Sequence, residues 1–187
     1  MKQLDIRLIV ISRSRFDTIQ KDTLSLLPDW VEVLVPVSEK EEYSKRISNP
    51  VITVPDQICG LGQLRNWVLD NFAEETVVMI DDDINTVYCL TGEKSQRIED
   101  KDQLVQIIIN DAVMAKDMGC KCFGFTQSDI RKYKNTEPFS MCGWVGCVIG
   151  VIGRKYRFRN DKYKVDIDFC LQNLLADRII FIDNRYV

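Results

Sequence analysis

Short apolar runs of strand length alternate along the chain with segments that carry a helical pattern. The apolar runs predict strands over residues 4–11, 31–37, 51–54, 76–80, 121–125 and 178–182. Helical spacing, capping residues and stop signals predict helices over residues 17–27, 39–46, 60–72, 100–118 and 166–176. Residues 126–140 are predicted to form a polar loop, and residues 143–152 a glycine-interrupted strand pair or one bent strand. This alternation predicts a single α/β domain with an open, mostly parallel sheet flanked by helices.

The chain contains no histidine among its 187 residues. This excludes Ser-His-Asp and Cys-His triads, an imidazole general base and His-ligated zinc sites. The seven cysteines are scattered and lack the spacing of a zinc knuckle, so we interpret them as reduced thiols of a cytoplasmic protein rather than a disulfide framework. Proton transfer or metal binding therefore falls to carboxylates, hydroxyls, thiols, amines or water.

The charge balance limits the partners of the protein. With 25 Lys and Arg against 28 Asp and Glu, the formal net charge of −3 argues against non-specific nucleic-acid binding by the whole surface, but allows a local basic patch. No apolar run approaches the length of about 18 residues that spans a membrane, and the first residues do not resemble a signal peptide. We expect no membrane contact, and the sequence does not define an oligomeric state.

Three consecutive carboxylates, Asp81, Asp82 and Asp83, follow the apolar run at residues 76–80. An unbroken apolar run is typical of a strand buried on both faces of a parallel sheet, and ligands of such sheets bind beyond the carboxyl ends of the strands. Because strand side chains alternate, Asp81 and Asp83 are expected to point the same way and to bind one Mg²⁺ or Mn²⁺ ion, with Asp82 facing elsewhere. The alternative is that these acids only cap the following turn.

Three motifs follow one another along the chain. They are an apolar first strand ending in Ser12-Arg13-Ser14-Arg15, the segment Gly60-x-Gly62-x-x-Arg65-Asn66, and the apolar run into Asp81-Asp82-Asp83. In this order they resemble the GT-A glycosyltransferases, and more narrowly the small phage-type, TET-associated glycosyltransferases of DNA modification. The resemblance covers most of the chain. It implies a GT-A-like, Rossmann-like fold with a donor-nucleotide half over residues 1–90 and an acceptor half over residues 91–187.

The resemblance also implies a nucleoside-diphosphate sugar as donor, with a UDP-sugar expected. Donor-binding roles would fall to Ser12, Arg13, Arg15, Gly62, Arg65, Asn66, Asp81 and Asp82. The metal, Mn²⁺ or Mg²⁺, would be bound by Asp81 and Asp83. Elementary chemistry agrees, because arginine binds phosphate in a bidentate manner and keeps its charge. Each arginine alone could equally be a solvated surface residue.

The family often carries a Glu-Asp-x-Asp pattern at the start of a late helix, where it supplies a base for the acceptor. The corresponding residues here are Val165-Asp166-Ile167-Asp168, with valine in place of the first acid. With no histidine present, Asp166 or Asp168 is the expected catalytic base. Asp166 could instead serve only as a helix N-cap.

Basic residues interleaved with aromatic ones point to an acceptor that carries phosphate. Residues 154–164 hold six basic residues against one acid, and residues 131–134 add a second basic-aromatic cluster. We expect Arg154, Arg157 and Trp144 to contact the acceptor, which the resemblance implies is a hydroxyl on a modified base in phage DNA. The alternatives are a solvated loop for the basic residues and core packing for Trp144.

Two other functions remain open at this point. Nucleotidyl transfer also uses an α/β sheet with arginines and metal-binding aspartates, but a Gly-rich loop with lysine would be expected where Ser12-Arg13-Ser14-Arg15 stands. The third possibility is a non-catalytic nucleotide or nucleic-acid binding module, which Val165 and the absent histidine keep open.

Overall fold

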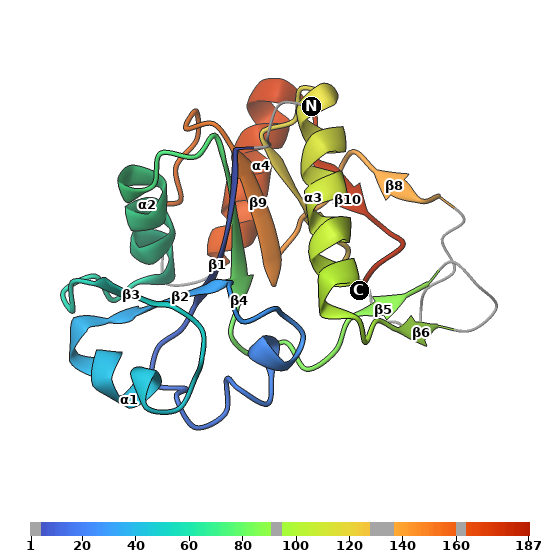
Figure 1. Ribbon diagram of the computed structural model, residues 1–187. Coiled ribbons are helices and arrows are strands. Elements are labelled where there is room, and N and C mark those ends of the chain that lie inside the picture. The colour runs from blue at the N-terminus through green and yellow to red at the C-terminus, as the bar shows by residue number, and fades with distance from the viewer. Residues whose placement is uncertain (1–4, 91–94, 128–136, 160–163) are drawn as a thin grey trace.

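A computed structural model describes residues 5–90, 95–127, 137–159 and 164–187. Eight strands form one sheet in the order β3-β2-β1-β4-β9-β7-β10-β8 (Figure 1). Their bounds are β1 Ile6–Ile11, β2 Glu32–Pro36, β3 Val51–Val54, β4 Thr76–Asp81, β7 Cys122–Phe125, β8 Phe139–Ser140, β9 Val148–Ile152 and β10 Phe181–Asp183. All are parallel to one another except β8 and β9, which pair antiparallel with their neighbours. The prediction of an open, mostly parallel α/β sheet is confirmed.

Helices cover both faces of this sheet. The α-helices are α1 Lys40–Ser44, α2 Leu61–Asn71, α3 Lys101–Asp117 and α4 Val165–Asp177. Two short 3₁₀ helices, η1 Thr23–Ser25 and η2 Val37–Glu39, and a small ribbon of β5 Tyr88–Cys89 and β6 Gln96–Arg97 complete the described elements. Figure 1 shows α3 crossing in front of the sheet, with α4 behind it and α2 at its side.

The alternation of side chains in β1 shows why both faces must be covered. Leu8 and Val10 are buried in the core beneath α3, whereas Ile9 and Ile11 are buried in the core beneath α2 and α4. β1 lies next to β4 in parallel register, with Ile11 opposite Asp81. The segments that follow β1 and β4 are therefore brought together at the carboxyl edge of the sheet.

The predicted helix over residues 17–27 is wrong. The segment instead forms successive turns and ends in η1. Its apolar spacing was real, because Ile19, Leu24 and Leu27 are buried. However, the Thr23 hydroxyl donates to the backbone carbonyl of Asp81 and accepts from the backbone N–H of Ile84. Such tertiary hydrogen bonds compete with continuous helical bonding.

Three smaller predictions also need correction. Residues 143–152 form one strand that begins only at Val148, because the preceding residues extend beyond the carboxyl end of β4. The last strand begins at Phe181 rather than at residue 178, since Arg178 adopts a left-handed conformation where α4 ends. The segment predicted as loop over residues 126–140 contains β8, and its residues 128–136 lie outside the described part. None of the described helices has the length and hydrophobicity required to cross a bilayer.

Candidate active site at the carboxyl edge of the sheet

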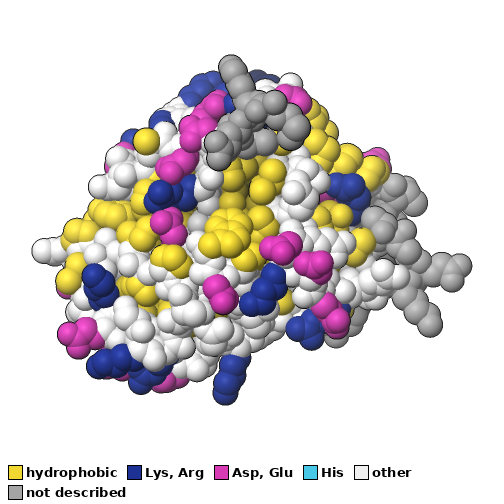
Figure 2. Space-filling view, in the orientation of Figure 1, with side chains coloured by type: hydrophobic (Ala, Val, Ile, Leu, Met, Phe, Trp, Pro, Cys, Tyr) yellow, Lys and Arg dark blue, Asp and Glu magenta, His cyan; other side chains and the backbone are white. Residues whose placement is uncertain are grey.

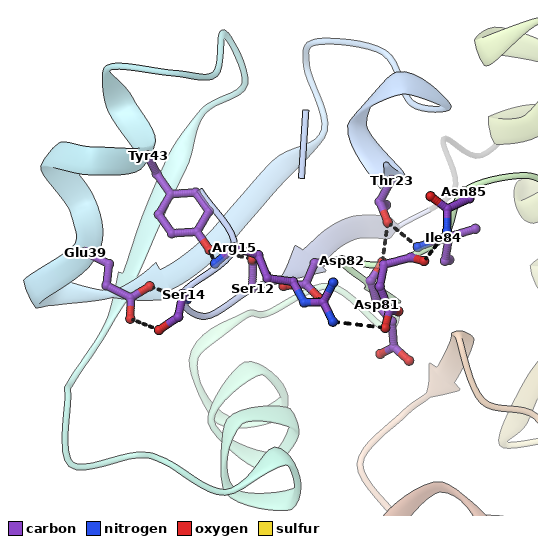
Figure 3. A network of polar contacts seen from close by, with 11 residues as sticks. Ser12, Ser14, Arg15, Thr23, Glu39, Tyr43, Asp81, Asp82, Ile84 and Asn85 are labelled. Atoms are coloured by element: carbon purple, nitrogen blue, oxygen red, sulfur yellow. Dashed lines mark hydrogen bonds and ion pairs between the residues drawn. The ribbon is translucent and has the colours of Figure 1, made fainter. Parts of the chain in front are cut away.

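The triple aspartate lies at the end of β4, as its sequence position predicts. Asp81 is the last residue of the strand, and Asp82 and Asp83 form the turn that follows (Figure 3). A pocket of about 280 Å³ opens here, lined by these three acids together with Ser12, Arg13 and Arg15. The structure thus brings together the end of β1 and the end of β4, which are about 70 residues apart in sequence.

Asp81 forms an ion pair with Arg65, which is carried by α2. The Arg65 Nη2 atom lies 3.2 Å from Asp81 Oδ1, and the arginine side chain is only 1% exposed. Burial raises the pKa of Asp81 to about 6, although the Arg65 charge opposes this rise. Because Arg65 is covered, it cannot reach the ribose or diphosphate of a bound donor as predicted. It instead holds the first carboxylate of the cluster from beneath.

Asp82 ends a directed chain of hydrogen bonds that begins at the backbone of the loop after β1 (Figure 3). The Arg15 backbone N–H donates to the Tyr43 hydroxyl at 3.0 Å, and the Tyr43 and Ser12 hydroxyl oxygens are 2.6 Å apart. Ser12 Oγ in turn donates to Asp82 Oδ2. Since Ser12 gives its proton to the carboxylate, Tyr43 must donate to Ser12. Burial raises the pKa of Asp82, and the Ser12 hydrogen bond opposes that rise.

The Arg15 side chain bridges the second and third aspartates. Its Nε lies 3.4 Å from Asp82 Oδ1 and its Nη2 lies 3.4 Å from Asp83 Oδ2. Asp83 is the most exposed of the three acids, with 53% of its side chain accessible, and Arg15 is 43% exposed. The guanidinium is therefore an accessible counterion of the cluster, in contrast to the buried Arg65.

Asp166, in the first turn of α4, faces the same edge. A Cβ atom at Gly146 would lie 3.3 Å from Asp166 Oδ2 and 3.3 Å from the Gln127 side chain. At the next residue, Cys147, burial and the negative charges of Asp81, Asp83 and Asp166 raise the pKa of the thiol to about 11. Carboxylates from β4 and α4 therefore act electrostatically on the same thiol at the start of β9.

Asp168 lies in a different environment from Asp166. Its carboxylate pairs with Arg159 at 3.1 Å and accepts from Gln172 at 2.7 Å. Residues two apart on a helix point to nearly opposite sides, which explains the separation. Of the two acids predicted as base, the geometry favours Asp166.

Of two further pockets at this edge, one reaches the triple aspartate. One of about 310 Å³ shares Asp83 with the first pocket and is lined by Asn85, Gln127 and Cys147. The other pocket, of about 270 Å³, is lined by Trp144 and Asn184. It shares Gln127 with the pocket of about 310 Å³. Trp144 is 40% exposed, so its indole is not a core side chain. The chain of pockets offers space for a donor and an acceptor side by side.

Other predicted residues are not brought to this edge. Arg154 lies at the opposite, amino edge of the sheet, where its guanidinium donates to backbone carbonyls at the end of α2. Arg157 pairs with Asp70 near the same end of α2. Neither is placed to contact an acceptor at Asp166. The basic cluster at residues 131–134 lies outside the described residues.

Two predicted donor-binding residues have structural contacts instead. The Asn66 amide donates to the Phe158 carbonyl and accepts from the Phe158 N–H, so its polar atoms are engaged. A Cβ atom at Gly62 would lie 2.5 Å from the Arg159 carbonyl oxygen, so only glycine permits this approach. The Gly-x-x-Arg-Asn motif therefore fastens α2 to the chain after β9 and supports Asp81.

A family model for the TET-associated glycosyltransferases matches residues 6–187 of this chain. The chain belongs to the TET-associated glycosyltransferase family. This match covers nearly the whole sequence and agrees with the resemblance predicted from the motifs at residues 12–15, 62–66 and 81–83. No curated protein matches the chain.

Solved structures with the same fold are glycosyltransferases. The structure of S. aureus TarS 1–349 with UDP-GlcNAc has a TM-score of 0.55 at 15% identity, covering 97% of this chain and 57% of that one. Mannosyltransferase PcManGT from Pyrobaculum calidifontis, in complex with GDP-Man and Mn²⁺, has a TM-score of 0.61 at 12% identity, covering 98% of this chain and 55% of that one. This TET-associated glycosyltransferase domain thus has the GT-A fold and spans little more than half the length of either protein.

The acids at the carboxyl edge suit a divalent cation that is shared with a diphosphate. Within the described ranges no group of three Asp, Glu, Cys or His side chains forms a complete metal cage. Mg²⁺ and Mn²⁺ often need only one or two carboxylates, because substrate phosphates and water supply the other ligands. Asp81 and Asp83 offer hard oxygen ligands in the pocket, while one oxygen of Asp82 accepts a hydrogen bond from Ser12. The donor set therefore fits such an ion.

Sequence reasoning missed three residues of the site. Gln127 follows the parallel strand β7, so the rule for strand ends that identified Asp81 also applied to it. Cys147 precedes β9, and only the antiparallel direction of that strand brings it to this edge. Tyr43 belongs to a short charged helix, and no local pattern indicates that its hydroxyl reaches Ser12.

Proposed function

We propose that this domain transfers a sugar from a nucleoside-diphosphate sugar to an acceptor hydroxyl, with a divalent cation bound at Asp81 and Asp83. The observation that carries the proposal is the pocket at the carboxyl edge of the sheet, which is lined by the three aspartates together with Arg13 and Arg15. The aspartates and arginines of this pocket suit a diphosphate and its metal ion. Asp166, beside Gly146, suits an acceptor hydroxyl that must lose a proton. Family membership favours sugar transfer over nucleotidyl transfer.

Each group then has a defined task. A bound Mg²⁺ or Mn²⁺ ion would offset the charge of the departing diphosphate. Arg13 and Arg15 line the pocket in which that diphosphate would lie. Asp166, whose carboxylate lies beside Gly146 and Gln127, would accept the proton of the acceptor hydroxyl. Residues 1–90 would carry the donor half of this site, and residues 91–187 the acceptor half.

The donor class is supported by the structural neighbours. TarS was crystallised with UDP-GlcNAc, and the mannosyltransferase with GDP-Man and Mn²⁺. We infer a nucleoside-diphosphate sugar for this domain as well, with a UDP-sugar as the first donor to test and a cytoplasmic setting, where such donors are available. As acceptor we propose a hydroxyl on a modified base in DNA.

The surface gives a mixed picture of DNA binding. The face shown in Figure 2 has basic and acidic side chains interspersed rather than a continuous basic band. Trp144 beside Asp166 offers a ring on which a base could stack. DNA contact would therefore be local and confined to the neighbourhood of Trp144.

The decisive test measures sugar transfer from UDP- and GDP-sugars, with Mn²⁺, to DNA that contains hydroxymethylated bases. Wild-type protein is expected to be active, and Asp83→Asn to lose nearly all Mn²⁺-dependent donor hydrolysis and transfer. Full activity of Asp83→Asn would refute the metal role. Stabilisation of the wild type by free nucleotide without turnover of any donor would instead favour a binding module.

A further inference from the structure

In the loop after β1, hydrogen bonds hold the backbone of Ser14 and Arg15, whereas the Arg15 guanidinium has only long contacts to the triple aspartate. The Tyr43 hydroxyl accepts from the Arg15 N–H, and both Glu39 carboxylate oxygens accept from Ser14, from its N–H at 2.7 Å and its Oγ at 3.0 Å (Figure 3). Ser14 adopts a left-handed conformation with φ of 57°, which these contacts hold in place. These contacts hold the backbone at Arg15, whereas its side chain is 43% exposed.

The Arg15 side chain lies where a cation bound to the triple aspartate would compete with it. It contacts Asp82 and Asp83 at 3.4 Å each, which is longer than a good charge-assisted hydrogen bond. More than two fifths of the side chain is exposed, so each ion pair is weak. No other basic side chain among the described residues forms a salt bridge with Asp83.

Arg7, at the other end of β1, is an arginine that bridges two carboxylates through short ion pairs and serves as a comparison for Arg15. It contacts Glu32 at 3.1 Å and Glu74 at 3.0 Å, and its guanidinium stacks over the Phe72 ring at 4.2 Å. Its side chain is 25% exposed. Arg15 has longer contacts, more exposure and no ring contact among the described residues. The geometry of Arg15 is that of an exchangeable counterion.

We propose that Arg15 is a counterion that a divalent cation displaces from Asp83, and that the released guanidinium binds the diphosphate of the donor. This proposal rests on the proposed function, since it assumes a metal at Asp83. No covalent step is involved. The divalent cation replaces the Arg15 guanidinium beside the carboxylates, and the released guanidinium pairs with the diphosphate of the incoming donor. Metal and nucleotide would therefore bind cooperatively, because each favours the same position of Arg15.

The exchange predicts effects of opposite sign in Arg15→Gln. Without the competing guanidinium, Mn²⁺ alone should bind about three- to tenfold more tightly than to the wild type. Without its charge on the diphosphate, UDP in the presence of saturating Mn²⁺ should bind about tenfold more weakly. Partial unfolding cannot produce this result, because it would weaken both ligands.

The experiment titrates Mn²⁺, followed by the electron paramagnetic resonance signal of the free ion, with and without UDP or GDP. Calorimetry measures the affinity for UDP and GDP with and without Mn²⁺, which completes the thermodynamic cycle of metal and nucleotide binding. Arg7→Gln is the matched control, since it also removes an arginine that bridges two carboxylates, but at the opposite edge. It should leave both Mn²⁺ affinities unchanged.

The outcomes separate this proposal from the proposed function. If Arg15→Gln binds Mn²⁺ alone no more tightly than the wild type, while the UDP–Mn²⁺ complex still forms, the exchange is overturned and the metal site stands. If tightening of Mn²⁺ binding is equal in Arg7→Gln and Arg15→Gln, a general charge effect replaces the exchange. If no form binds Mn²⁺ even with UDP or GDP, the metal role in the proposed function falls, and the exchange with it.

Discussion

The two ends of β1 carry the same residue types in different states. At the amino end, Arg7 sits between two glutamates with short contacts and an aromatic neighbour. At the carboxyl end, Arg15 reaches two aspartates at longer distance and lies more open to solvent. Both arrangements neutralise acids, but only at the carboxyl end are the arginine and one of its acids largely exposed to solvent. Contact length and exposure, rather than residue type, distinguish the two arginines.

A second pair of arginines supports this distinction. Arg154, at the amino edge, donates to the carbonyls of Leu69, Phe72 and Glu74 and so closes the end of α2. Arg65, beneath the carboxyl edge, makes one ion pair with Asp81, and its Nε and Nη1 have no hydrogen-bond partner among the described residues. Arg154 thus has its hydrogen-bond donors satisfied by the fold, whereas Arg65 is buried with two donors unpaired beside Asp81.

The largest effect is expected at the carboxyl edge from Asp166→Asn. Loss of a general base usually lowers the rate by 10²- to 10⁴-fold, so kcat for transfer should fall in that range, while UDP–Mn²⁺ binding stays near the wild-type level. Asp168→Asn is the control, because its carboxylate is paired with Arg159 and Gln172. Equal losses in the two variants would contradict the assignment of Asp166 as the base.

The amino edge should respond in stability rather than in binding. Arg154→Met removes several hydrogen bonds to carbonyls and should lower the free energy of unfolding by about 2–4 kcal/mol. Urea unfolding measures this loss, and UDP–Mn²⁺ affinity of the folded protein at low temperature should not change. Arg157→Gln, which breaks one exposed pair, should cost less than about 1 kcal/mol. A weaker nucleotide affinity in Arg154→Met would break the proposed division between the two edges.

Asp111, which is buried beside Asp183, tests how burial and a neighbouring carboxylate together set the charge state of an acid. Burial and the neighbouring Asp183 raise the pKa of Asp111 to about 9, and Arg185 opposes the rise from 4.0 Å. Between about pH 4 and pH 9 the folded protein then holds one proton more than the unfolded chain. Its stability should therefore fall as pH rises through this window, by up to about 1.4 kcal/mol per pH unit.

Asp111→Asn should remove this pH dependence. The variant is expected to be more stable than the wild type at pH 8, and to lose that advantage near pH 4. Thermal or urea unfolding across this pH range measures the difference. Asp117→Asn, an exposed position on the same helix, should leave the wild-type slope in place. An unchanged slope in Asp111→Asn would mean that another group binds the proton.

The smallest effect is expected from Tyr43→Phe, which breaks the hydrogen-bond chain to Asp82 without touching a ligand. The Arg15 N–H and Ser12 Oγ each lose a partner, so the loop is less well fixed. We expect UDP–Mn²⁺ affinity to fall about three- to tenfold, with kcat nearly unchanged. Tyr88→Phe on β5 serves as the control. An unaltered affinity in Tyr43→Phe would show that the loop needs no support from α1.

The strands were the most predictable part of the fold. The apolar runs that became β1, β2, β3 and β4 were located to within about two residues, because buried parallel strands need continuous apolar side chains. The segment over residues 17–27 failed because its apolar spacing suits helix and packed turns alike, and the Thr23 hydrogen bonds to the β4 end decided for turns. Short-range patterns could not reveal that contact.

The candidate site residues also fall into those that the sequence indicated and those whose position only the fold decided. Asp81, Asp83 and Asp166 were identifiable because acids beyond an apolar strand or at a helix start are chemically conspicuous. Asn66, Gly62 and Arg65 share a motif with functional meaning in the resemblance. In the structure, however, the Asn66 amide bonds the Phe158 backbone, Gly62 lies against the Arg159 carbonyl, and the Arg65 side chain is buried. Arg154 and Arg157 looked suitable for an acceptor by composition alone, and the path of the chain after β9 carries them to the other edge.

The sequence by itself determined the alternating strand and helix order, the absence of imidazole chemistry and the place of the acidic cluster after β4, because these depend on local composition and periodicity. Only the tertiary structure decided which charges remain available. An arginine or aspartate has the same local signal whether it is paired, buried or exposed, and its state is set by partners far along the chain, as Tyr43, Arg65 and Asp166 show.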